Sequence, residues 1–113
     1  MIANTPQPPY YAVIFTSERT EIENGYGETA DRMVELASAQ PGFLGVESAR
    51  NKSFDSAQDD RLGITVSYWS DLESIKNWKM NAEHTIAREK GRSDWYKAFK
   101  VRIAKVERDY DFG

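Results

Sequence analysis

The chain has 113 residues, of which 40% are hydrophobic and 29% are charged. This length suits one compact domain and is too short for separate cofactor and catalytic domains, and the composition is that of a globular protein rather than a disordered or fibrous one. The formal net charge of -3, from 18 acidic and 15 basic residues, provides no positive field for phosphate backbones, so we expect no nucleic-acid partner.

The chain has no cysteine and one histidine, which excludes a disulfide framework, a thiolate metal site and a cysteine nucleophile. These counts also disfavour a structural zinc site, and the sequence contains no glycine-rich phosphate loop or Ser-His-Asp series. The first residues lack the basic start and apolar run of a signal peptide, and no segment approaches the ~20 apolar residues that span a membrane. We therefore expect a cytoplasmic protein with no membrane partner.

Residues 1–9 are expected to form an extended leader, because Pro8-Pro9 has fixed φ angles and lacks backbone donors. A single domain is then expected over residues 10–113. Its first strand runs from Tyr10 to about Ser17. Apolar residues in this strand do not alternate with polar ones, so both of its faces are expected to be buried.

A helix is expected from about residue 26 to residue 39, because apolar residues recur there at helical spacing. The residues expected to face the sheet are Tyr26, Ala30, Met33, Val34 and Ala37. Pro41-Gly42 ends this helix by removing a donor and permitting a turn. A second strand follows over about residues 43–50. Residues 52–61 are expected to form a polar loop rather than a cation site, because EF-hand spacing is missing.

The third strand is expected over about residues 62–69, with packing residues on both faces. Ser70 or Asp71 can cap the helix that follows through a side-chain oxygen. The stripe expected on this helix consists of Leu72, Ile75, Lys79 and Ala82, with Trp78 at its edge. After a short turn at Ser93-Asp94, the last strand is expected around residues 99–104.

The order β, α, β, β, α, β is the ferredoxin-like arrangement, an α+β fold with an antiparallel sheet and two helices on one face. Strands that are apolar on both faces leave the other face of the sheet in need of cover. A two-fold homodimer whose sheets close face to face is the economical solution. The alternative is a monomer whose terminal segments fold over this face, for which the polar leader is a poor cover.

Four segments carry a resemblance to a known family. They are Gln40-Pro41-Gly42-Phe43-Leu44-Gly45, Tyr68-Trp69-Ser70-Asp71-Leu72-Glu73, Trp78-Lys79-Met80-Asn81-Ala82-Glu83-His84 and Gly91-Arg92-Ser93-Asp94-Trp95-Tyr96. Over about residues 10–108 the chain resembles the antibiotic biosynthesis monooxygenase (ABM) domain family. The resemblance implies a dimeric α/β barrel in which each protomer's pocket lies between its sheet and helices. Members include cofactor-independent oxygenases of phenolic polyketide intermediates and haem-degrading oxygenases.

The chain departs from the haem-degrading members at two places. Those members would place their iron-binding histidine where Arg88 stands, and an asparagine in the first strand, which here reads Val13-Ile14-Phe15-Thr16. These departures disfavour haem degradation by that mechanism and leave haem binding in another pose open. We expect no cofactor.

His84 is the one available candidate for a general acid or base near neutral pH. If Asn81 caps a second helix, His84 and Arg88 lie one turn apart on one face, where an anionic ligand could meet both. If the helix is unbroken from Leu72, both residues point away from the apolar stripe. A solvent-exposed histidine at a helix start is the alternative interpretation.

Four large aromatic residues could line a flat pocket for a polycyclic ligand, and ordinary packing is the alternative for each of them. They are Tyr68, Trp69, Trp78 and Trp95. Glu47 and Arg50, on the second strand, are expected to form a surface or cross-strand pair.

The leading hypothesis is a cofactor-independent monooxygenase of the ABM type that acts on an aromatic or polycyclic small molecule. The deprotonated substrate itself would reduce dioxygen, with His84 as the proton acceptor and Arg88 stabilising the substrate anion. The alternative is a non-catalytic small-molecule-binding or stress-related dimeric module, in which the pocket holds a ligand without turnover.

Overall fold

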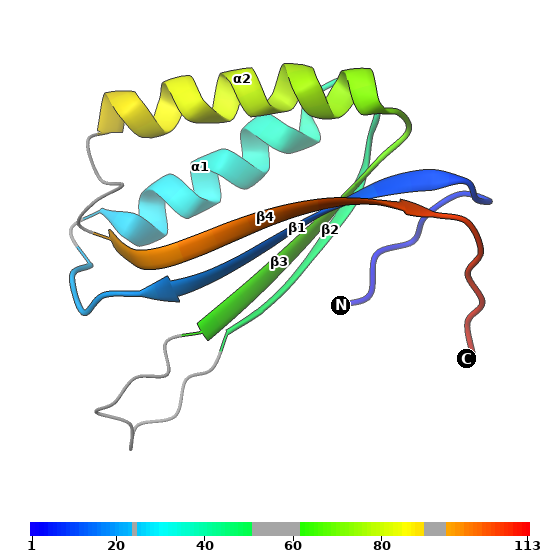
Figure 1. Ribbon diagram of the computed structural model, residues 1–113, viewed down its shortest axis with the longest axis horizontal. Helices are drawn as coiled ribbons and strands as arrows, with labels where there is room; N and C mark the ends of the chain where they lie inside the picture. The colour runs from blue at the N-terminus through cyan, green and yellow to red at the C-terminus, as the bar shows by residue number, and fades with distance from the viewer. Residues whose placement is uncertain (24, 51–61, 90–94) are drawn as a thin grey trace.

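The computed structural model describes residues 1–23, 25–50, 62–89 and 95–113, with the side chains of residues 84–89 outside the description. The elements are β1 (Tyr10–Arg19), α1 (Tyr26–Ser38), β2 (Phe43–Arg50), β3 (Leu62–Trp69), α2 (Leu72–Glu89) and β4 (Tyr96–Val106). Figure 1 shows both helices on one face of the sheet. The predicted polar loop over residues 52–61 and the predicted turn at Ser93-Asp94 lie outside the described residues.

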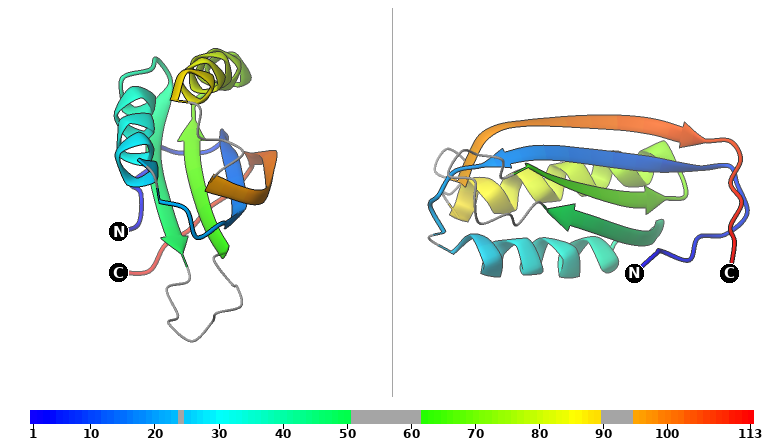
Figure 2. Two further views of the ribbon diagram at one scale, coloured as in Figure 1. Left: turned by 90° about the vertical axis from the view of Figure 1, so that its left-hand side faces the viewer. Right: turned by 90° about the horizontal axis from the view of Figure 1, so that it is seen from below.

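The four strands form one antiparallel sheet in the order β2-β3-β1-β4. This topology confirms the predicted ferredoxin-like βαββαβ fold. The central strands are β3 and β1, while β2 and β4 are the edges. Figure 2 shows α1 beside β2, with β4 at the opposite edge of the sheet.

The pairing register assigns each strand residue to one face, because directly opposed residues project from the same side of a sheet. Tyr11 and Val13 pack against the core beneath the helices, so we call their face the helix side and the other face the open side. Phe15 pairs with Val101, and Val13 pairs with Ile103, which places both β4 residues on the helix side.

Trp69 is the centre of the core. It is fully buried, and it forms a cluster with Ala37 of α1 and Ile75 of α2. Its ring stacks on that of Trp78, with centroids 6.1 Å apart, and meets Phe43 edge-on at 5.4 Å. The indole Nε1 donates a 2.8 Å hydrogen bond to the hydroxyl of Ser67, which satisfies its only polar atom. One residue on β3 therefore ties both helices to the sheet.

Helix α1 follows the prediction with two differences. It ends at Ser38, one residue before the predicted end, and Val34 is exposed although it was predicted to face the sheet. Ala37 is buried as predicted, and Thr29, which was not predicted to face the sheet, is buried as well. The prediction placed too many apolar residues on one face, because an apolar residue at the edge of a stripe can remain in solvent.

Helix α2 begins at an Asp71 cap, since Oδ1 of Asp71 accepts a 2.8 Å hydrogen bond from the backbone N–H of Ser74. This bond lowers the pKa of the Asp71 carboxyl. Ile75 is buried, whereas Leu72 and Lys79 of the predicted stripe are exposed, so that part of the prediction is wrong. The face that packs instead includes Ser74, which is buried, and Trp78, which packs against the core cluster.

The helix runs without interruption to Glu89. Asn81 does not cap a second helix: its Nδ2 donates to the carbonyl of Asn77 at 3.1 Å, one turn earlier, and lies 3.4 Å from Oε1 of Gln40. The observed backbone is thus the unbroken one of the two alternatives.

The leader lies against one end of the open side. The backbone N–H of Ala3 donates a 2.8 Å bond to Oε2 of Glu47, and the hydroxyl of Thr5 donates to that of Tyr10 at 3.0 Å. The Tyr10 hydroxyl donates in turn to Asp109 of the C-terminal tail. Figure 1 shows both termini on the side of the sheet away from the helices. Contrary to expectation, the leader covers part of the open side, because it brings backbone donors as well as side chains.

Gly42 lies between α1 and β2 and packs against Ser74 in the first turn of α2, and we predict that it tolerates no side chain. Its φ is 86°, and a Cβ there would lie 2.6 Å from Cβ of Ser74. Gly42→Ala should lower the free energy of unfolding by about 3 kcal/mol, the sum of a left-handed backbone and an overlap. Gly25→Ala is the matched control, since Gly25 has the same φ with nothing within 4 Å, and should cost only about 1 kcal/mol. Equal losses in urea unfolding would contradict the overlap.

The hydroxyl of Tyr68 donates a 2.7 Å bond to Glu47, and burial followed by this bond raises the pKa of Tyr68 to about 12. Because the folded pKa exceeds the ordinary value of 10.0, the bond should stabilise the fold fully below pH 10 and lose its effect as the pH approaches 12. Tyr68→Phe should therefore cost about 1 kcal/mol at pH 8, and the cost should shrink as the pH rises above 10. Urea unfolding from pH 7 to pH 11 measures this, with Tyr110→Phe, in the exposed tail, as the control without a cost.

Candidate functional site

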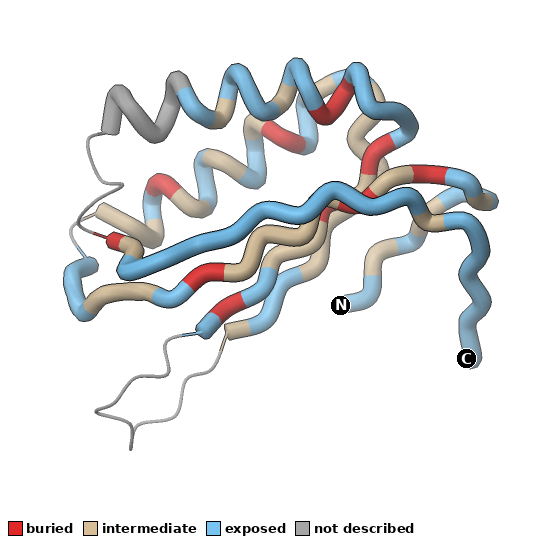
Figure 3. The backbone as a smooth tube through the Cα atoms, in the orientation of Figure 1, coloured by how far each residue is buried: buried red, intermediate tan, exposed pale blue. Residues whose placement is uncertain are grey.

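An apolar surface lies on the helix side of the two strands farthest from α1. It consists of Phe15, Phe99, Val101 and Ile103, which we call the apolar strip. The helices pack mainly on β2 and β3, and the three residues of β4 are 39%, 47% and 51% exposed. Figure 3 shows β4 as an exposed edge over most of its length. Apolar residues on the face where the helices lie are thus open to contact.

Arg50 crosses the sheet on the same side. Its register partner on β3 is Gly63, and the partner of Gly63 on β1 is Ser17. Nη2 of Arg50 donates a 2.9 Å hydrogen bond to the Ser17 hydroxyl and lies 3.5 Å from the hydroxyl of Tyr26. A Cβ on Gly63 would lie 2.8 Å from Nε of Arg50, so only glycine lets this side chain pass over β3.

Arg19, the last residue of β1, lies against Tyr26 of α1. Its Cζ lies 3.4 Å from the centroid of the Tyr26 ring, which is a cation–π contact. Nε donates to the carbonyl of Trp95 at 3.2 Å, and Nη2 to that of Ile22 at 2.8 Å. Burial lowers the pKa of Arg19, and the positive charge of Arg50 acts in the same direction. Two guanidinium groups therefore lie close enough to repel each other.

Tyr96 contacts both Tyr26 and the apolar strip. Its side chain is hydrogen-bonded to Tyr26, and burial raises its pKa far above the ordinary value, so the phenol is neutral at pH 7. Its ring meets those of Phe15 and Phe99 with centroids 5.6 Å and 5.8 Å apart. We call Ser17, Arg19, Tyr26, Arg50 and Tyr96 the hydroxyl–guanidinium cluster.

The cluster provides positive charge and hydroxyl groups but no base that works near neutral pH. Arginine stays protonated, and a phenol is already protonated near neutral pH, so neither group can accept a proton there. The arrangement can hold and polarise an oxygen atom of a ligand whose rings lie on the apolar strip. A proton acceptor would have to come from outside the cluster.

The four predicted pocket aromatics do not line one surface. Trp69 and Trp78 stack in the core, and Trp95 is buried against Tyr26, with ring centroids 5.8 Å apart. Tyr68 lies on the open side, where it meets Tyr10 and Glu47. Alternation along β3 separates Tyr68 from Trp69, because consecutive strand residues face opposite ways.

His84 and Arg88, the predicted catalytic pair, both lie in α2, and their side chains are outside the described ones. The unbroken helix is the backbone for which the sequence pattern places both residues away from the apolar stripe. Their role stays a prediction.

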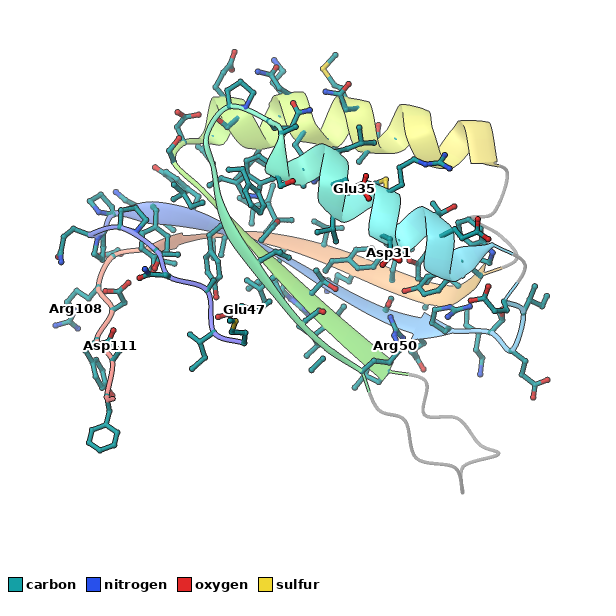
Figure 4. All side chains as sticks on the ribbon, turned by 180° about the vertical axis from the view of Figure 1, so that it is seen from behind. Asp31, Glu35, Glu47, Arg50, Arg108 and Asp111 are labelled. Atoms are coloured by element: carbon teal, nitrogen blue, oxygen red, sulfur yellow. The ribbon has the colours of Figure 1, made fainter. Side chains whose placement is uncertain are left out.

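The predicted pairing of Glu47 with Arg50 is wrong. The two residues lie on opposite sides of the sheet, as Figure 4 shows, with Glu47 near the leader and Arg50 at the far end of β2. Sequence reasoning also missed the role of Ser17 and Gly63. The sequence does show a serine in the apolar strand β1 and a glycine in β3. That these two residues lie opposite each other follows only from the strand register.

Among the described residues, no group of three or more histidine, cysteine, aspartate or glutamate side chains is placed to hold a metal ion. In the same part of the chain, neither helix combines the length and apolar character that crossing a bilayer requires.

Comparison with known sequences gives two findings. Residues 9–90 match the sequence model of a family described as antibiotic biosynthesis monooxygenase. Over 107 residues the chain is 55% identical to YqjZ of Bacillus subtilis (strain 168), a protein described as uncharacterized. This match covers 95% of the present chain and 88% of YqjZ.

Solved structures share the fold. PA3566 from Pseudomonas aeruginosa has a TM-score of 0.65 and 16% identity, with 93% of this chain and 99% of that chain covered. SnoaB, a cofactor-independent oxygenase from Streptomyces nogalater, also has a TM-score of 0.65, with 8% identity and coverage of 90% and 97%. At these identities the likeness concerns the fold alone.

Proposed function

Because the chain belongs to the antibiotic biosynthesis monooxygenase family, we propose that it is a cofactor-independent monooxygenase of an aromatic or polycyclic small molecule. The observation that carries the proposal is the apolar strip, which ends at the hydroxyl–guanidinium cluster. Flat rings pack on aromatic and aliphatic side chains, and a few polar groups fix their orientation. SnoaB, an oxygenase that works without a cofactor on the same fold, is consistent with this reaction type.

In the proposed reaction the substrate supplies the electrons. A CH₂ carbon beside an aromatic ring loses a proton to a base, and the resulting carbanion reduces dioxygen. One oxygen atom enters the substrate as a carbonyl, and the other leaves as water with the two hydrogen atoms of the carbon. The protein must hold the rings, stabilise the negative charge and accept a proton.

His84 is the proposed proton acceptor, because it is the only histidine and the cluster contains no base. Arg88, four residues later on α2, is proposed to stabilise the substrate anion.

A non-catalytic binding module is the second candidate. It is favoured by the packing of Trp69 and Trp78, which fill the space between β3 and α2 that a larger pocket would use. In this case the apolar strip would hold a ligand without turnover.

We also propose a homodimer that forms through the open side. The support is the exposure of Leu62 and Ile64, at 45% and 41%, on a part of this side distant from the Tyr10 end that the leader covers. A contiguous apolar area on a sheet face is typical of an interface.

The oxygenase is tested with 1,8-dihydroxyanthrone, a phenolic polycycle with a reactive CH₂ group, in air and under argon. We expect protein-dependent oxygen uptake and a product that has gained one oxygen atom and lost two hydrogen atoms. His84→Ala should fold and bind normally but turn over at least about 100-fold more slowly. Glu83→Gln, on the preceding residue, is the control with normal turnover.

Equal turnover in His84→Ala would contradict the assigned base. Tight binding with no oxygen uptake above the protein-free rate would overturn the oxygenase in favour of the binding module. Haem serves as the contrasting ligand, for which we expect no degradation.

The dimer is tested by substitutions on the open side. Val66→Asp should halve the mass in solution or unfold the protein, because a charge cannot be buried unpaired in an apolar interface. Ile64→Asp separates the two outcomes better. The side chain of Ile64 is 41% exposed in the protomer, so a folded monomer tolerates the charge. Ser48→Asp, an exposed residue of β2 on the helix side, is the control. Light scattering that finds one unchanged mass for all variants would refute this interface.

A further inference from the structure

We infer that Arg50 anchors an anionic oxygen of the ligand, so that the protein selects aromatic anions over neutral aromatic molecules of the same shape. The inference rests on the proposed function, because it takes the surface described above to hold the substrate. Its starting point is the passage of Arg50 over Gly63. This passage places a planar cationic donor over the middle of the sheet rather than in solvent at its edge.

Positive charge is concentrated at this place. Arg19 and Arg50 both reach the ring or hydroxyl of Tyr26, and each charge acts on the other. Glu23 offsets part of the charge of Arg19, and its carboxylate also accepts a 3.2 Å hydrogen bond from the N–H of Gly27. An anion between the two guanidinium groups would relieve their repulsion, which is a gain that a neutral ligand cannot give.

The hydroxyl groups of the cluster suit the same ligand. Ser17 is 1% exposed, so its hydroxyl is held in place beside Arg50 instead of exchanging with water. Tyr96 is hydrogen-bonded to Tyr26, and burial raises the pKa of the Tyr96 phenol, which keeps it protonated. Donors and guanidinium groups together bind oxyanions more strongly than neutral oxygen atoms.

The position of the anion fixes the position of the rings. Phe15 and Phe99 contact each other and Tyr96, so the apolar strip begins where the cluster ends. A ligand with its oxyanion at Arg50 would lay its rings along Phe99 and Val101. The same charge stabilisation would favour the ionised form of a phenolic substrate, which is the form that reduces dioxygen.

The test uses two probes of equal shape, 2-naphthoate and 2-naphthamide, and measures their binding to the full chain by calorimetry under argon. We expect the anion to bind at least about tenfold more tightly than the amide. Arg50→Gln should remove this preference and leave amide binding unchanged, and Arg50→Lys should keep part of it. Arg102→Gln is the matched control, because it removes the same charge on the open side of the sheet.

Gly63→Ala tests the geometry without altering Arg50, and it should also remove the preference, because a Cβ would displace the guanidinium. If this variant does not fold, Arg50→Gln decides the matter. Equal binding of the two probes, no binding of either, or equal losses in Arg50→Gln and Arg102→Gln would overturn the inference. Because dioxygen is absent, anion-selective binding that Arg50→Gln removes supports the anchor even if turnover later fails. Oxygen-dependent turnover of the anthrone together with equal binding of the two probes would overturn the anchor alone.

Discussion

The burial of Trp69 is the constraint on which the rest of the structure depends. Its indole is fully buried on a central strand, and it meets α1 through Ala37 and α2 through Ile75 and Trp78. Removing a large ring from water contributes strongly to the free energy of folding. Both helices are therefore held over β3 and β2, and the helix side of β4 is left exposed.

On the helix side of β3, the side chains become smaller with distance from Trp69. Passing back along the strand from Trp69, the side chains on this side are those of Ser67 and Thr65, and Gly63 has none. The bulk that separates the helices from the sheet thus decreases toward one end. At that end Arg50 passes over β3 to reach Ser17. The hydroxyl–guanidinium cluster occupies the space that these smaller side chains leave.

The sequence was sufficient for the strands, the helices and their order, because hydrophobic period and turn residues act locally. It was insufficient for the site, because the contact between Arg50 and Ser17 depends on two pairing registers that no local pattern specifies. The wrong pairing of Glu47 with Arg50 has another cause, which is the alternation of side chains along a single strand. Two residues that are three positions apart on a strand project from opposite faces of the sheet. Only the register shows which of these faces carries the helices.

Because side chains alternate along each strand, the proposed dimer interface and the proposed ligand surface lie on opposite sides of the sheet. On the open side, Glu47 binds the leader and Tyr68, and the exposed Leu62 and Ile64 lie in the proposed dimer interface. On the helix side, Arg50 and the apolar strip form the proposed binding surface for a small molecule. No described side chain of the cluster can serve both, so a signal from the interface to the ligand would have to pass through the backbone of β1 and β3. Ligand binding and dimerisation are therefore expected to be chemically independent properties of one sheet.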